Sequence, residues 1–72
     1  MKKLDLHGMP HEEVPEVVHG FINENWREGQ ELCVITGHSR VMKRIVRDVL
    51  DMYDVEVEEG DPHNPGYLKV MT

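Results

Sequence analysis

The chain has 72 residues, of which 39% are hydrophobic and 31% are charged. This length accommodates one domain with a small core, and the composition is typical of a folded protein. No stretch approaches the roughly 18 consecutive apolar residues of a membrane span, and the start, Met1-Lys2-Lys3, lacks the apolar region of a signal peptide. The single cysteine, Cys33, excludes an intrachain disulfide and is expected to be a buried apolar residue. We expect one soluble, cytoplasmic domain over residues 1–72.

Charge is distributed unevenly along the chain. The formal net charge of -6 argues against a simple nucleic-acid binder, because phosphate contacts require lysine and arginine. Half of the 8 basic residues, however, fall in segment 40–47, which contains no acid: Arg40, Lys43, Arg44 and Arg47. We therefore expect a bipolar molecule in which this segment is the basic pole.

The first predicted element is a short strand over residues 4–7, where apolar and polar residues alternate up to Gly8. A helix follows, with Pro15 in its first turn, where a missing N–H is tolerated. Gly29 is placed to end this helix. One face of the helix is apolar, formed by Val14, Val17, Val18, Phe21 and Ile22.

The second half of the chain repeats the strand–helix order. An apolar run over 31–36 has the length of a strand and is closed by Gly37, and Ser39 is a suitable N-cap for the next helix. Further strands are predicted around 55–57 and over 67–71, on either side of a turn-rich segment, 60–66. The second helix has an apolar face, expected to consist of Val41, Met42, Ile45, Val46, Val49 and Leu50.

The predicted fold is an α/β two-layer sandwich with the order β-α-β-α-β-β, a mixed four-stranded sheet and two helices. Right-handed crossovers make the first three strands parallel, and the last connection suits an antiparallel hairpin. The carboxyl ends of parallel strands share one edge of the sheet, where open α/β sheets commonly bind ligands. The loops at 7–8, 37–39 and 61–66 should therefore meet there.

The segment from Thr36 through Gly37, His38 and Ser39 to Arg40 is a candidate phosphate site. A strand that turns through glycine into a helix exposes backbone N–H groups, and the helix dipole favours an anion at that end. Arg40 and Lys43 add positive charge in the first turn. The alternative is structural: Gly37 turns the chain and Ser39 caps the helix.

Asp5 and His7 are a candidate acid–base pair. Residues two apart in a strand point to the same side, and a carboxylate beside an imidazole can orient it for proton transfer. The structural alternative is a solvated aspartate and a histidine bonded to a backbone carbonyl.

His63, Asn64 and Gly66 form a third candidate site. The two polar side chains can bond a phosphate or a base, although a loop tip is also the commonest place for such residues. Tyr67 can stack on a base or pack against the fold. The five histidines show no recognised ligand spacing, so we assign no metal site.

These segments together resemble the Smr (small MutS-related) domain family. Its pattern comprises an LDLHG-like opening, an apolar strand ending in a TG-containing loop, a second helix and a late glycine before the last strand. The matching residues here are 4–8 (LDLHG), 34–37 (VITG), 41–46 (VMKRIV) and 64–67 (NPGY). The match covers nearly the whole chain in the correct order.

The resemblance implies a compact mixed sheet with two helices, and DNA nicking, RNA endonuclease cleavage or nucleic-acid binding without cleavage. Asp5 and His7 match positions linked to cleavage in the family, with Gly8 closing the motif. Thr36 and Gly37 match the start of the second motif. The family usually continues with a basic residue and another glycine, whereas this chain continues directly with His38 and Ser39, as if the loop were shortened.

The leading hypothesis is therefore a nucleic-acid-binding domain with DNA-nicking or RNA endonuclease activity. Asp5 would orient His7, and His7 or His38 would act as general acid or base. RNA cleavage can use the 2′-OH without metal, whereas DNA nicking needs activated water, often on a divalent metal such as Mg²⁺. Phosphate or base contacts would come from Gly8, Thr36, Gly37, Ser39, Arg40, Lys43, Arg44, His63, Asn64 and Gly66.

Two alternatives stay open. A non-catalytic adaptor could bind a basic protein partner through an acidic surface formed by Glu12, Glu13, Glu16, Glu56, Glu58 and Glu59. A binder of a small phosphate compound would use the same helix N-terminus. Salt dependence and competition by inorganic phosphate distinguish these alternatives from nucleic-acid binding.

Overall fold

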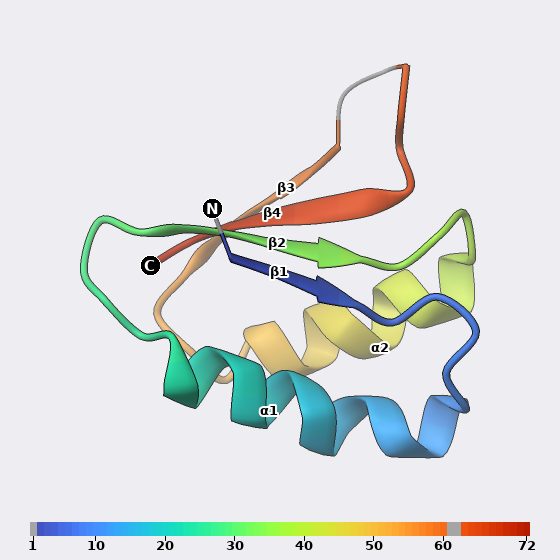
Figure 1. The fold of residues 1–72 in the computed structure, drawn as a ribbon, viewed down its shortest axis with the longest axis horizontal. Helices are drawn as coiled ribbons and strands as arrows, with labels where there is room; N and C mark the ends of the chain where they lie inside the picture. The colour runs from blue at the N-terminus through green and yellow to red at the C-terminus, as the bar shows by residue number, and fades with distance from the viewer. Residues whose placement is uncertain (1, 61–62) are drawn as a thin grey trace.

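The computed structural model describes residues 2–60 and 63–72, so Asp61 and Pro62 of the predicted turn lie outside the described residues. No helix in this part of the chain is long and apolar enough to cross a membrane. Figure 1 shows the elements in chain order: β1 (Lys2–Asp5), the short 3-10 helix η1 (His11–Glu13), α1 (Val14–Glu24), β2 (Glu31–Ile35), α2 (Arg40–Leu50), β3 (Glu56–Glu59) and β4 (Tyr67–Met71).

The strands form a mixed sheet in the order β1-β2-β4-β3. β1 pairs with β2 in parallel, and β4 is antiparallel to both β2 and β3. β1, β2 and β3 therefore run in the same direction, with β4 inserted between β2 and β3. The predicted α/β class and the antiparallel final hairpin are both confirmed.

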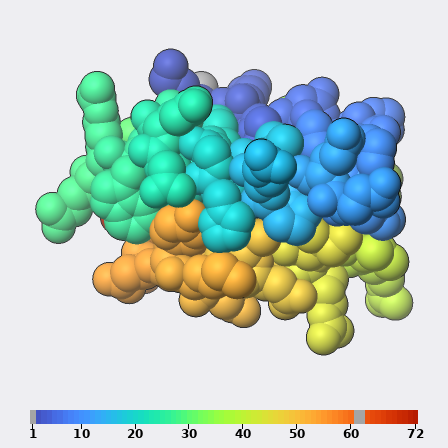
Figure 2. All heavy atoms as spheres, turned by 90° about the horizontal axis from the view of Figure 1, so that it is seen from below, coloured from blue at the N-terminus to red at the C-terminus, as the bar shows by residue number. Residues whose placement is uncertain are grey.

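Both helices lie on the same side of the sheet (Figure 1), and the space-filling view of that side shows them packed next to each other (Figure 2). Alternation along the strands directs one set of side chains at the helices. The resulting core is made of fully or almost fully buried residues: Leu6, Val14, Val18, Ile22, Leu32, Val34, Met42, Val46, Val49, Leu50, Leu68 and Val70.

The first helix is shorter than predicted. It ends at Glu24, and both the backbone N–H and the side-chain amide of Asn25 donate to the carbonyl oxygen of Phe21, at 3.1 and 2.9 Å. The first is the last i→i−4 bond of the helix, and the second adds a side-chain donor to the same carbonyl. Gly29, with φ of +78°, instead shapes the turn before β2.

The face of the second helix also differs from the prediction at one position. Val41, expected in the core, is 56% exposed, whereas Met42, Val46, Val49 and Leu50 are buried. With 3.6 residues per turn, Val41 lies about 100° around the helix from Met42, to one side of the face formed by the buried residues. Ser39 caps this helix as predicted, because its hydroxyl oxygen accepts the N–H of Met42 at 3.1 Å.

A matched pair of substitutions on α2 checks this assignment. Val46 is fully buried, so Val46→Ala removes two methyl groups from the core and should lower the free energy of unfolding by about 2 kcal/mol. The same change at exposed Val41 should alter it by less than about 0.5 kcal/mol, because Ala favours helix and little packing is removed. Urea unfolding of both variants measures the difference. Equal losses of stability would contradict the position of the helix face.

Candidate nucleic-acid interface

Three chain segments meet at one edge of the sheet, at the carboxyl ends of β1 and β2 and the start of β4 (Figure 1). The carbonyl oxygen of Gly66 joins two of them, the end of β2 and the start of β4. It accepts the backbone N–H groups of Thr36 and Gly37, at 3.0 and 2.9 Å, and lies 3.4 Å from the Thr36 hydroxyl oxygen. Thr36 is 2% exposed, so these bonds are shielded from water. The predicted convergence of the loops is confirmed for the described residues.

His7 lies at this edge, but in a turn rather than in the strand that the alternation predicted. β1 ends at Asp5, whose carboxylate accepts the backbone N–H of His7 at 2.9 Å. The acid therefore stabilises the turn through the main chain. The ring of His7 lies over Gly37: a methyl group on Gly37 would be only 3.2 Å from Cδ2 of His7.

His38 has a corresponding position one loop further along the edge. A methyl group on Gly66 would lie 3.5 Å from both Cδ2 and Nε2 of its ring. The N–H of Gly66 donates to the side-chain oxygen of Asn64 at 3.3 Å. Each imidazole thus lies against the glycine of the neighbouring loop. We call His7, Gly37, His38 and Gly66 the histidine edge.

The sequence-predicted basic segment divides into two pairs. Lys43 and Arg47 both approach the carboxylate of Glu59 on β3, at 3.4 and 3.6 Å, and the Lys43 side chain is only 15% exposed. Arg40 and Arg44 are exposed and form no ion pair with any residue that the structure describes. Arg40 and Arg44 are therefore the cations of this segment that can bind phosphate without first giving up an ion pair.

The remaining candidate residues are placed around this edge. Gly8 and Ser39 are exposed in the turns that follow β1 and β2, and His63 and Asn64 are exposed in the segment that leads into β4. Among residues 2–60 and 63–72, no three His, Cys, Asp or Glu side chains come together as a metal site would require.

The glutamates of the predicted acidic surface lie on separate elements of the fold. Glu12 and Glu13 lie in η1, whereas Glu56 and Glu58 lie on β3. Glu59 is engaged by Lys43 and Arg47. The acids available to a basic partner are thus divided between the start of the first helical region and one edge of the sheet.

The contact between His7 and Gly37 can be tested with two glycines of similar backbone conformation. Gly37 and Gly29 have φ of +68° and +78°, so Ala at either should lower the free energy of unfolding by about 1–2 kcal/mol. Only at Gly37 does the added methyl meet a side chain, whereas nothing lies within 4 Å of one at Gly29. Gly37→Ala alone should therefore shift the imidazole NMR signals of His7. Unchanged signals would contradict the contact.

Comparisons with known proteins agree with these motifs. The family model of the Smr domain matches residues 4–66, a span that begins in β1 and ends at Gly66. Comparison with curated proteins and with solved structures found no match. The matched span contains all of the histidine edge and the whole of α2. This chain belongs to the Smr domain family, whose members are in general nucleic-acid-binding or nuclease-like domains.

Proposed function

We propose that this Smr domain binds nucleic acid at the histidine edge and cleaves its phosphodiester backbone there. The observation that carries the proposal is the placement of two imidazoles, His7 and His38, against Gly37, which precedes α2, and Gly66, which precedes β4. Imidazole changes its protonation near neutral pH, so two such rings can supply one proton acceptor and one proton donor.

The phosphate would be held beside these rings. The first turn of α2 has N–H groups that no helical carbonyl accepts, and anions are favoured at this positive end of the dipole. Arg40 and Arg44 are exposed there without an ion-pair partner among residues 2–60 and 63–72. Arginine binds phosphate through several N–H groups at once. These features support a phosphate position between the two arginines and the histidine edge.

With RNA, the proposed chemistry needs only groups that the chain and the substrate supply. One neutral imidazole removes the proton of the 2′-OH, and the 2′ oxygen attacks the adjacent phosphorus. The P–O bond to the 5′ oxygen breaks, and that oxygen takes a proton from the second, protonated imidazole. The products are a 2′,3′-cyclic phosphate and a 5′-hydroxyl end. DNA lacks the 2′-OH, so its nicking would require an activated water, commonly on a divalent metal.

The binding part of the proposal predicts a difference between the two pairs of cations. Replacing Arg40 and Arg44 with Gln should weaken binding of a single-stranded oligonucleotide and make the slope of log K against log salt less negative by roughly 1.4, or about 0.7 for each of the two phosphates that is no longer neutralised. Lys43→Gln with Arg47→Gln removes the same formal charge from cations that share the single carboxylate of Glu59. Its effect on the slope should be smaller. Equal effects, measured by fluorescence anisotropy at several salt concentrations, would contradict the assigned phosphate position.

The catalytic part predicts that His7→Ala and His38→Ala each reduce cleavage by roughly 10²–10⁴-fold while binding is retained, because each variant lacks a proton-transfer group. Labelled single-stranded RNA, single-stranded DNA and supercoiled plasmid should be compared with Mg²⁺ and with EDTA. His19→Ala is a suitable control, because His19 bonds to Tyr53 rather than to the edge. Cleavage that survives both edge substitutions would overturn the mechanism. A native protein without binding at low salt would favour the adaptor function.

A further inference from the structure

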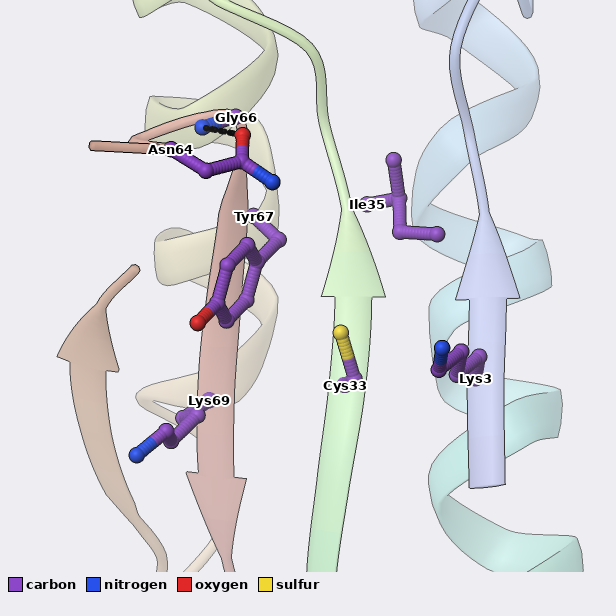
Figure 3. Close-up of a pocket in the computed structure, with 7 residues that line it drawn as sticks. All are labelled: Lys3, Cys33, Ile35, Asn64, Gly66, Tyr67 and Lys69. Carbon is purple, nitrogen blue, oxygen red and sulfur yellow. Dashed lines mark hydrogen bonds between the residues drawn. The ribbon is translucent and has the colours of Figure 1, made fainter. Parts of the chain in front are cut away.

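The sheet face opposite the helices holds a hollow of about 720 Å³. Figure 3 shows side chains from three strands around it: Lys3 from β1, Cys33 and Ile35 from β2, and Tyr67 and Lys69 from β4. The strand register places Cys33 opposite both lysines, so Lys3 and Lys69 lie on either side of it. Their backbones are two strand spacings apart, or roughly 10 Å.

This hollow is continuous with the histidine edge. Asn64 and Gly66 line its upper end in Figure 3, and Gly66 is the residue against which His38 lies. A chain bound at the proposed phosphate position can therefore extend over Gly66 onto the open face of the sheet. The two sites share a wall rather than lying on separate parts of the molecule.

Tyr67 is held in a defined position within the hollow. Its ring lies so close to Gly60 that a methyl group on that glycine would be 2.7 Å from Cε1 and 2.8 Å from Cδ1. The glycine thus makes room for the ring, and the ring is supported by backbone on that side. Tyr67 is only half-buried, so part of the aromatic surface faces the hollow. A supported, accessible aromatic ring is suited to stacking with a base.

Among residues 2–60 and 63–72, those that line the hollow include two cations and no acid, although Glu58 of β3 lies across from Lys69 in the strand register. Lys69 approaches Glu31 at 3.6 Å, but both side chains are about a third exposed or more, and such a pair is easily exchanged for another anion. Lys3 forms no ion pair with any part of the chain that the structure describes. In a molecule of net charge -6, a cavity with this lining favours a negatively charged ligand that also has a flat, apolar surface.

We propose that the hollow is a subsite for single-stranded nucleic acid, in which one base stacks on Tyr67 and the neighbouring phosphates contact Lys3 and Lys69. This inference rests on the proposed function and specifies its substrate class. A base must leave its own stack to lie on Tyr67, and a duplex keeps its bases paired and stacked within the helix. The domain therefore prefers single strands to duplexes of the same sequence.

The aromatic contact is tested by two substitutions at one position. Tyr67→Leu should weaken binding of a single-stranded oligonucleotide by about tenfold, because the base can no longer stack. Tyr67→Phe keeps the ring and should stay within about twofold of the native affinity. A matched 12-base-pair duplex should bind more weakly than the single strand and should not distinguish the two variants. Thermal unfolding shows whether each variant remains folded.

The lysines are tested through the salt dependence. Two phosphate contacts at Arg40 and Arg44 give a slope of log K against log salt of roughly -1.4 for a single strand, and two further contacts bring it to roughly -2.8. Lys3→Gln with Lys69→Gln should return the slope to the smaller value. Lys2→Gln is the control for the loss of one positive charge outside the hollow: Lys2 neighbours Lys3 on β1, but it does not line the hollow.

Chemical labelling of Cys33 tests directly whether a ligand occupies the hollow, without a measurement of affinity. It is the only cysteine of the chain and is 5% exposed within the hollow. Burial raises the pKa of the Cys33 thiol, with a smaller opposing effect from Lys3, so labelling requires an alkaline buffer. A saturating single strand should slow labelling several-fold, whereas the duplex and inorganic phosphate should not.

The outcomes separate the subsite from the proposed function. If the Arg40 and Arg44 substitutions weaken binding but those at Tyr67, Lys3 and Lys69 do not, and Cys33 is labelled at the same rate with or without the strand, the subsite is overturned and the proposed function stands. If the native protein binds no nucleic acid, both are overturned. Protection of Cys33 by a basic peptide in place of the oligonucleotide would likewise overturn the nucleic-acid subsite.

Discussion

The carbonyl oxygen of Gly66 is the acceptor on which the arrangement of this domain's loop edge depends. Two main-chain N–H groups, from Thr36 and Gly37, converge on it, and the Thr36 hydroxyl lies nearby. These bonds join the end of β2 to the start of β4, two segments far apart in the chain. They also position Gly37 beneath His7 and Gly66 beside His38. A buried acceptor left without donors is costly. The need to satisfy this carbonyl therefore fixes the two loops, and with them the glycines against which the histidine rings lie.

β2 and β4 are the two central strands of the sheet, so their side chains contribute to both of its faces. Alternate side chains of β2 and β4, such as Leu32 and Leu68, fill the core against the helices. The residues between them, including Cys33 and Tyr67, face the opposite side and form the hollow. Because β4 starts where β2 ends, this open face leads directly into the histidine edge. One pair of strands therefore contributes to the core, the loop edge and the hollow.

Much of this organisation could be predicted because it depends on local patterns. Helical spacing identified the core face of α1, Ser39 was recognisable as a cap, and the strand–helix order implied the shared loop edge. α1 ends instead at Glu24, where the side-chain amide of Asn25 donates to the carbonyl oxygen of Phe21. The burial of Lys43 depends on Glu59, sixteen positions away and on another element. Neither contact leaves a periodic signal in the sequence.

The site residues show the same limit. The motifs indicated that His7, Gly37, His38 and Gly66 belong together, but the pairing of each ring with the glycine of the next loop follows from tertiary packing. The alternation of residues 4–7 suggested a side-chain partnership between Asp5 and His7, whereas the carboxylate bonds to the main chain. Turn geometry took precedence over strand alternation, because the strand ends before His7.

The open sheet has a further consequence for how copies of this domain behave at high concentration. β1 and β3 are its outer strands, and each is only 4 residues long. β1 begins with Lys2 and Lys3, whereas β3 carries glutamate at all but one position. Like edges therefore repel, and short, charged outer strands are a known protection against ladder extension between molecules. These charges oppose pairing of like edges between copies, whereas a β1 edge and a β3 edge carry opposite charge, so the shortness of both strands is what limits that pairing.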